Sequence, residues 1–202
     1  MVITMKKLTA FITVLLIFTL CSCGAPADGQ PSAKSTSGQS AAPTRQGTGA
    51  VKGSFAKFTA TDLNGNTITQ DVLKGKKVTM INIWATFCGP CIDEMPDLGL
   101  ISAEYADRGF QIIGIISDAV DYSGNADTSI MAQAADIITQ TKANYLHIVP
   151  SDDINTIILS EVTAVPTTVF VEENGNILED NHIGSRSKRE WENIINRLLE
   201  NA

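Results

Sequence analysis

Apolar and polar positions follow one another in blocks that predict alternating strands and helices. Residues 77–83 and 110–116 are largely apolar runs, as expected for strands that are buried on both faces. Apolar residues recur at helical spacing over residues 88–108 and 129–142, and again after Ser187. Strands that alternate with helices in this way predict an α/β fold with a central mixed sheet and helices on both faces.

Two β-hairpins are expected at the ends of this pattern. The Asn-Gly step at Gly65 lies between the extended runs 54–59 and 67–69, which is a strong hairpin signal. A second hairpin is expected from residues 167–172 and 176–183. The first hairpin precedes the alternating strands and helices, and the second precedes the last helix.

Short elements and helix ends complete the prediction. Residues 145–149 predict a strand, and residues 152–160 a short helix with an acidic first turn. Pro96 lies inside the predicted helix 88–108 and is expected to remove a hydrogen bond and bend that helix. Gly109 is expected to end it, and the segment Ser187-Lys188-Arg189-Glu190 is a capping box that opens the final helix.

The composition is that of an ordinary globular protein. The chain has 202 residues, of which 44% are hydrophobic and 18% charged, so one domain with appendages is expected. The net charge is −7, and loss of residues 1–22, which hold two lysines and no acids, would make it −9. An acidic chain argues against a nucleic-acid partner held by phosphate contacts.

The N-terminus has the form of a targeting segment. Lys6 and Lys7 precede an apolar run over residues 8–20, which is typical of a signal peptide and short for a membrane span of about 20 residues. A short membrane anchor that stays attached is the alternative. The segment Leu20-Cys21-Ser22-Cys23 resembles the bacterial lipobox, and this resemblance implies that Cys23 becomes the first mature residue and carries a lipid.

Small and polar residues dominate the segment that follows. Such a composition cannot bury enough apolar surface to offset the entropy of ordering, so residues 23–51 are expected to form a flexible tether. The predicted organisation is therefore a signal peptide over residues 1–22, this tether, and one folded domain over residues 52–202.

The segment Trp84-Ala85-Thr86-Phe87-Cys88-Gly89-Pro90-Cys91 carries the candidate chemistry. It joins a predicted strand to a predicted helix, so Cys88 lies where the unpaired N–H groups of a helix N-terminus favour the thiolate. Pro90 fits a first helical turn, and Cys91 is close enough to attack a mixed disulfide on Cys88. A static disulfide and two inert thiols remain alternatives. Half a zinc site is disfavoured, because two more ligands are missing.

The chain resembles the thioredoxin superfamily on two motifs. Trp84-Ala85-x-x-Cys88-Gly89-Pro90-Cys91 matches the active-site motif, and Val165-Pro166-Thr167 before a hairpin matches the cis-proline loop. The N-terminal hairpin, an α/β insertion around residues 119–149, the lipobox and Glu94-Met95-Pro96 resemble the membrane-anchored TlpA/ResA-like branch. The resemblance covers roughly residues 52–202 and implies a thioredoxin fold.

This resemblance implies roles for individual residues. Cys88 is the attacking cysteine, Cys91 is the resolving one, and Pro166 is cis. The backbone of Val165 then lies beside the sulfurs, where a substrate chain can pair with it as an added strand. The alternative for Pro166 is a plain proline at the start of a strand.

One position departs from the superfamily pattern. Where classical cytosolic thioredoxins have a buried Asp, six residues before the first cysteine, this chain has Asn82, which cannot take up a proton. Glu94 is the candidate replacement, because it lies one helical turn beyond Cys91 on the same face. The alternative is a solvated carboxylate on the surface of the helix.

The remaining site residues surround the two cysteines in sequence. Trp84 and Phe87 are expected to form an apolar docking rim, although aromatic residues in strands are often core residues. Gly89 and Pro90 complete the substrate-binding set that the resemblance implies. No metal and no cofactor other than the Cys88–Cys91 pair is expected.

Three further polar residues carry weaker expectations. His147 and His182 are separated by sheet elements and are expected to be structural or exposed. Arg186, in the loop after Gly184, is expected either in a solvated loop or near the rim of the active site.

The sequence thus predicts a tethered thiol–disulfide oxidoreductase on the extracytoplasmic face of a bacterial membrane. Its expected partners are client proteins with disulfides, namely apocytochrome c or an extracellular methionine sulfoxide reductase, and a membrane electron donor of the CcdA/DsbD type. A monomer is expected. Alternatives are an oxidase or isomerase that installs disulfides, and a non-catalytic lipoprotein that uses the fold as a docking platform.

Overall fold

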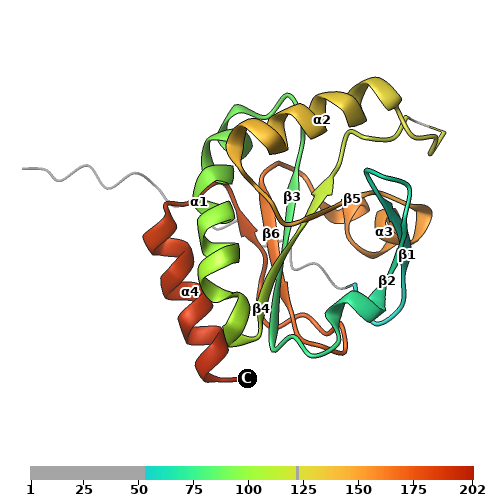
Figure 1. Ribbon diagram of the computed structural model, residues 1–202. Helices are drawn as coiled ribbons and strands as arrows, with labels where there is room; N and C mark the ends of the chain where they lie inside the picture. The colour runs from blue at the N-terminus through green and yellow to red at the C-terminus, as the bar shows by residue number, and fades with distance from the viewer. Residues whose placement is uncertain (1–52, 122) are drawn as a thin grey trace, which may run out of the picture. The chain divides into compact units, whose positions relative to one another are not determined.

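Among the residues that the structure describes, seven strands form one mixed sheet in the order β2-β1-β5-β4-β3-β6-β7 (Figure 1). The computed structural model describes residues 53–121 and 123–202. The strands are β1 (Thr59–Asp62), β2 (Thr67–Thr69), β3 (Val78–Trp84), β4 (Phe110–Ile116), β5 (Leu146–Val149), β6 (Thr167–Val171) and β7 (His182–Ile183). β3, β4 and β5 run parallel, and the other neighbours are antiparallel.

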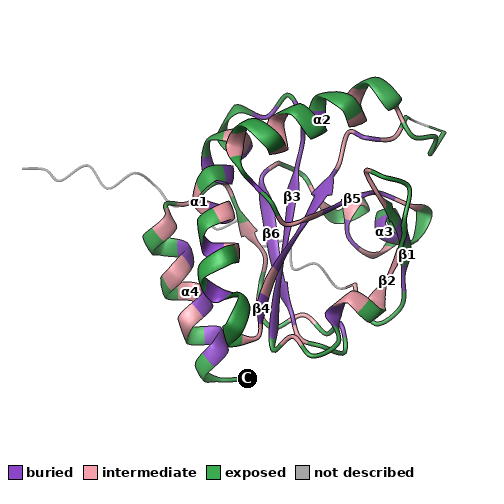
Figure 2. Ribbon diagram, viewed as in Figure 1, coloured by how far each residue is buried: buried purple, intermediate pink, exposed green. Residues whose placement is uncertain are grey.

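Helices cover both faces of this sheet, as the sequence predicts. The α-helices are α1 (Gly89–Tyr105), α2 (Thr128–Thr141), α3 (Asp152–Ile157) and α4 (Lys188–Glu200), and the 3-10 helices are η1 (Gln70–Leu73), η2 (Ala106–Arg108) and η3 (Leu159–Glu161). α1 packs against α4 and α2 on one side of the sheet, and α3 lies on the other side beside β1 (Figure 1). The two apolar runs, β3 and β4, lie at the centre and are almost fully buried (Figure 2).

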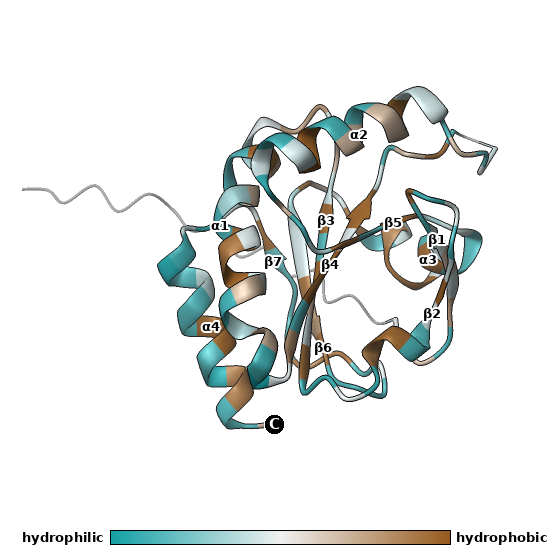
Figure 3. Ribbon diagram, viewed as in Figure 1, coloured by the Kyte–Doolittle hydropathy of each residue, from teal (hydrophilic) through white to brown (hydrophobic). Residues whose placement is uncertain are grey.

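Alternate residues of the central strands face different cores. Leu98 of α1 and Trp191 of α4 pack on the face that carries Met80, and Ile154 of α3 packs on the face that carries Ile81 and Ile83. Apolar residues line the inward sides of α1 and α4, with polar residues outside (Figure 3). Ser187 and Glu190 form the predicted capping box of α4.

The helix that follows the cysteines agrees closely with the sequence. α1 and η2 together span residues 89–108, Pro96 lies inside α1, and Gly109 follows in the left-handed conformation with φ of 80°. Glycine adopts this backbone conformation without steric cost, so the chain can turn directly into β4.

Both hairpins form, but their strands differ from the prediction. β1 begins at Thr59 rather than at residue 54, because the preceding residues are held elsewhere: the Phe55 N–H donates to the carbonyl of Gly175 (2.8 Å). The return strand of the second hairpin is interrupted. Val171 pairs with Ile177, whereas Thr168 pairs with His182, so the return strand has two extra residues that break the ladder.

The predicted signal peptide, the lipidated Cys23 and the tether lie outside the described residues. Within residues 53–121 and 123–202, none of the helices is long and apolar enough to cross a membrane.

Candidate functional site

Cys88 and Cys91 form a disulfide at the start of α1, with Cα atoms 5.3 Å apart. Cys88 is the N-cap residue, and the backbone N–H of Cys91 points at its sulfur from 3.2 Å. Cys88 retains 7% of its surface and Cys91 only 1%, while Gly89 and Pro90 are exposed. The structure therefore places Cys88 as the more accessible sulfur, at the helix end whose dipole favours a thiolate.

The loop before Cys88 is fixed by the segment that follows β4. The Thr86 N–H and hydroxyl donate to the carboxylate of Asp118, the hydroxyl at 2.6 Å. Ser117 donates from its N–H (2.8 Å) and its hydroxyl (2.9 Å) to the carbonyl of Trp84. These bonds hold the residues between β3 and α1 in one conformation. Asp118 was not predicted from the sequence, because an isolated Asp in a loop carries no local signal of its partner.

The Val165–Pro166 peptide bond is cis, as the resemblance implies. Pro166 is buried, and Val165 packs against the apolar cluster that contains both cysteines. On either side, the Thr167 hydroxyl donates to the carbonyl of Ala164 (2.7 Å), and the Gly184 N–H donates to the carbonyl of Pro166 (2.8 Å). The cis-proline loop and the disulfide thus adjoin the same cluster.

Glu94 lies in the second turn of α1 and is buried, with 4% of its surface exposed. Its Oε1 accepts a hydrogen bond from the amide of Asn82 (3.1 Å). Its Oε2 accepts from the Arg186 N–H (3.1 Å) and from the Trp191 indole (3.2 Å). Burial raises the pKa of Glu94, and these three donors oppose that shift.

This environment decides between the two alternatives for Glu94, because a solvated helix-face carboxylate is excluded. A buried acid with a raised pKa beside Cys91 on one helix is suited to hold or release a proton during disulfide exchange. The sequence indicated Glu94 but gave no sign of its partners Arg186, in the loop before α4, and Trp191, on α4. Of the two positions expected for Arg186, a solvated loop or near the active site, the structure shows the second. Its guanidinium lies 5.0 Å from the Trp191 ring centre.

The two residues of the predicted aromatic rim differ in exposure. Phe87 is 77% exposed beside the disulfide, whereas Trp84 has no exposed surface. The prediction that Trp84 lines an exposed rim is therefore wrong: it is the last residue of β3, and its side chain belongs to the core. Its indole N–H donates to Nδ1 of His147 (3.2 Å), so of the two expected states of His147, structural or exposed, the exposed one is excluded.

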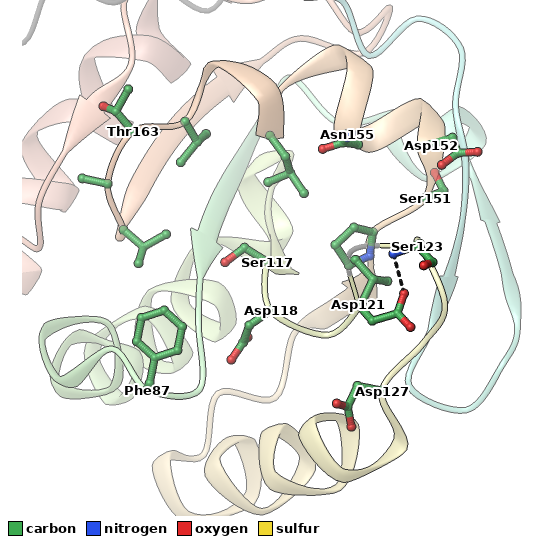
Figure 4. Close-up of a pocket in the computed structure, with 17 residues that line it drawn as sticks. Phe87, Ser117, Asp118, Asp121, Ser123, Asp127, Ser151, Asp152, Asn155 and Thr163 are labelled. Carbon is green, nitrogen blue, oxygen red and sulfur yellow. Dashed lines mark hydrogen bonds between the residues drawn. The ribbon is translucent and has the colours of Figure 1, made fainter.

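A groove of about 1010 Å³ begins beside the redox loop. We name it the acidic groove and define it by six lining residues: Phe87, Asp118, Asp121, Asp127, Asp152 and Val165. Figure 4 shows Phe87 at one end, with Asp127 and Asp152 far from it. Among the described residues its lining contains no Lys, Arg or His.

The carboxylates of the acidic groove are spread along it rather than gathered. In the part of the chain that the structure describes, no group of three or more His, Cys, Asp or Glu side chains is placed to hold a metal ion. Hydrogen bonds hold the pKa values of Asp121 and Asp127 below the usual range, so both stay ionised at neutral pH. The groove therefore presents negative charge along its length, from the redox loop outwards.

Comparisons with known proteins agree with this geometry. The model of the Redoxin family matches residues 38–195. The chain is 31% identical over 136 residues to the thioredoxin-like protein YneN of Bacillus subtilis, covering 67% of this chain and 72% of that one. It is 27% identical over 143 residues to the thiol-disulfide oxidoreductase ResA of Bacillus cereus, covering 70% and 74%.

A solved structure has the same fold. A thiol:disulfide interchange protein of the thioredoxin family from Chlorobium tepidum matches with a TM-score of 0.57 and 25% identity, covering 71% of this chain and 93% of that one. The family model spans most of the chain, and the redox disulfide, the cis-proline loop and the mixed sheet all lie within it. The chain therefore belongs to the Redoxin family and is a thioredoxin-like thiol–disulfide oxidoreductase of the ResA type.

Proposed function

We propose that this oxidoreductase reduces disulfides of client proteins outside the cytoplasm. The observation that carries the proposal is the Cys88–Cys91 disulfide at a helix N-terminus, with the buried acid Glu94 one turn further along the same helix. The Cys-Gly-Pro-Cys sequence supports reduction, because thioredoxin, with a potential of about −270 mV, shares it, whereas the oxidant DsbA has about −120 mV.

The reaction uses the reduced pair. The Cys88 thiolate attacks one sulfur of a client disulfide, which forms a mixed disulfide and releases the other client sulfur as a thiolate that takes a proton from water. Cys91 loses its proton to Glu94 and attacks the Cys88 sulfur. The Cys88–Cys91 bond forms, and the second client sulfur leaves as a thiolate that takes a proton from water. Two electrons have then passed to the client, and Glu94 returns its proton to solvent.

Re-reduction requires a second partner. We infer a membrane electron donor of the CcdA/DsbD type, because the lipobox resemblance and the tether would hold the domain close to the membrane surface. Lipidation at Cys23 and a position on the extracytoplasmic face belong to the same proposal. Apocytochrome c and an extracellular methionine sulfoxide reductase are the client classes that we propose.

The acidic groove supplies a place for the client chain. The Val165 N–H and carbonyl have no hydrogen-bond partner among residues 53–121 and 123–202, so a client strand can pair with them. From that point the groove leads past Asp118 to Asp127 and Asp152. We propose that it takes an extended client segment with Lys or Arg residues close to its cystine, because opposite charge favours encounter and register.

A trapping experiment tests the proposal. In the full chain, Cys91→Ser leaves the mixed disulfide on Cys88 unresolved, so clients are expected to stay attached and to be released by a reducing agent. Cys88→Ser is the matched control and should trap nothing. A potential above about −150 mV would favour the oxidase, and cellular function that survives in the Cys88→Ser, Cys91→Ser double variant would favour the docking lipoprotein.

A further inference from the structure

A row of four polar residues and one glycine crosses the sheet on the face that α1 and α4 cover. Cross-strand pairing places His182, Thr168, Asn82, Gly114 and His147 side by side on one face, on the five neighbouring strands β7, β6, β3, β4 and β5. Glu94 bonds to the middle of this row through Asn82, as described above. The far end of the row, at His147, has no part in the mechanism proposed so far.

His147 has both ring nitrogens engaged and only 5% of its surface exposed. Its Nδ1 accepts from the Trp84 indole, and its Nε2 lies 3.1 Å from the carbonyl of Ala143. A carbonyl can only accept, so the hydrogen is on Nε2 and the ring is neutral. Tyr145 stacks on the ring with centroids 4.4 Å apart, which further fixes its orientation.

Gly114 provides the space in which Trp84 and His147 meet. A Cβ atom at this position would lie 2.3 Å from Nδ1 of His147 and 3.1 Å from Nε1 of Trp84. Any larger residue would therefore displace one of the two rings. Gly114 of β4 thus leaves the space for the hydrogen bond between Trp84 of β3 and His147 of β5, so three neighbouring strands form one arrangement.

Trp84 links this arrangement to the redox loop. It is four residues before Cys88, and its side chain packs in the same buried cluster as Cys88 and Cys91. Its carbonyl is held by Ser117, as described above. The indole hydrogen bond to His147 holds one edge of this ring, and the ring belongs to the same buried cluster as the two cysteines.

We propose that His147 is a positioning residue for the redox reaction. It acts through Trp84: by accepting the indole N–H it fixes the ring against the Cys88–Cys91 pair, and so sets the relative stability of the disulfide and dithiol forms. This role adds to the thiol–disulfide exchange activity and does not depend on which client is reduced.

The test measures the equilibrium constant of the Cys88–Cys91 pair with glutathione, together with the thiol pKa of Cys88. His147→Leu should shift the equilibrium constant about three- to tenfold, the range expected if the lost hydrogen bond stabilises one of the two redox forms more than the other. His147→Asn keeps an acceptor near the position of Nδ1 and should stay within about twofold of the parent. Leu73→Ala, in the core on the opposite face, controls for lost stability alone and should not shift the constant.

A double-mutant cycle with Trp84→Phe completes the test. If His147 acts through Trp84, His147→Leu should have little further effect once the indole N–H is gone. Should the leucine variant not fold, Trp84→Phe alone removes the same bond from the other side and should itself shift the constant. The proposal is overturned by an unshifted constant in His147→Leu or Trp84→Phe, by additive shifts, or by equal shifts in the Asn and Leu variants.

Discussion

The two faces of the central strands differ in the side chains that they present. Facing α3, the middle of β3, β4 and β6 presents only aliphatic side chains, which are Ile81, Ile83, Ile113, Ile115, Val169 and Val171. Facing α1, the same strands present Asn82, Gly114 and Thr168 among the apolar residues, and Asn82 Oδ1 has no hydrogen-bond partner among the described residues. Buried polar groups of this kind cost stability unless they are paired.

The difference separates the face that mainly stabilises the fold from the face that carries residues near the redox site. The α3 face stabilises the fold through apolar burial, which is large and insensitive to the order of side chains. The α1 face holds Asn82 and His147 in fixed positions, and Asn82 bonds to Glu94 of α1 above it, at some cost in stability. Substitutions on the two faces should therefore affect different measurements.

The largest effect is expected on the α3 face. Ile83→Ala removes a fully buried side chain and should lower the free energy of unfolding by about 2–5 kcal/mol. The equilibrium constant of the cysteine pair with glutathione should not change, because Ile83 points away from α1. Chemical denaturation of the oxidised protein measures the first quantity. A redox equilibrium that shifted along with stability would contradict the separation of the two faces.

The sequence predicts the apolar strands and the local helix signals better than it predicts the contacts around the redox site. β3 and β4 were predictable because a strand buried on both faces needs apolar residues throughout, and the capping box of α4 because its partners are three residues apart. The partners of Glu94 were not predictable, because Arg186 and Trp191 are separated from it by more than 90 residues. Trp84 was misplaced because an aromatic residue next to a redox motif gives no sign of which way it points.

The second effect is a pH dependence on the α1 face. Burial lowers the pKa of His147 from 6.5 to about 4. Between these values the unfolded chain binds a proton that the folded protein does not, so stability is lost as the pH falls from 6.5 towards 4. The full loss corresponds to about 3 kcal/mol.

Comparison of the parent with His147→Asn isolates this contribution. The variant has no titrating ring, so its unfolding free energy should fall less between about pH 7 and pH 4. Glu94 titrates with the opposite sign, but it is present in both proteins and cancels in the difference. Equal losses in the two proteins would show that His147 does not stay neutral in the folded state.

The third effect concerns Glu94 itself. Glu94→Gln removes the proton acceptor for Cys91 and should slow client reduction by about tenfold or more. It should also change the thiol pKa of the cysteine pair, because a buried charge nearby has gone. Asp93→Asn, an exposed acid next to it on α1, is the matched control and should alter neither quantity. Unchanged titration and turnover in Glu94→Gln would remove Glu94 from the mechanism.

Glu94→Gln should not unfold the domain. Because the pKa of Glu94 is raised, its ionised form costs stability above its unfolded pKa, so a neutral Gln should leave the unfolding free energy at pH 7 equal or higher. Asn82 can turn its amide so that the unpartnered Oδ1 accepts from the new side-chain N–H. A marked loss of stability would mean that the ionised carboxylate holds α4 on α1.

The smallest effect is expected outside both faces, in the acidic groove. Asp127→Asn removes one charge but keeps the oxygen that caps α2 through the N–H groups of Ser129 and Ile130. For a peptide disulfide flanked by lysines, kcat/KM should fall about two- to threefold, and its decrease with added salt should become shallower. A peptide of equal length flanked by glutamates should show no such loss.

A matched variant separates the groove from the overall charge of the protein. Asp136 lies on the exposed side of α2, the helix that Asp127 caps, and does not line the groove. Asp136→Asn therefore changes the net charge as much as Asp127→Asn does, but away from the groove. If steering by net charge alone were responsible, both variants would slow the lysine-flanked peptide equally. A loss confined to Asp127→Asn places the client segment in the groove, and equal losses would remove it from there, because only the position of the charge differs between the two proteins.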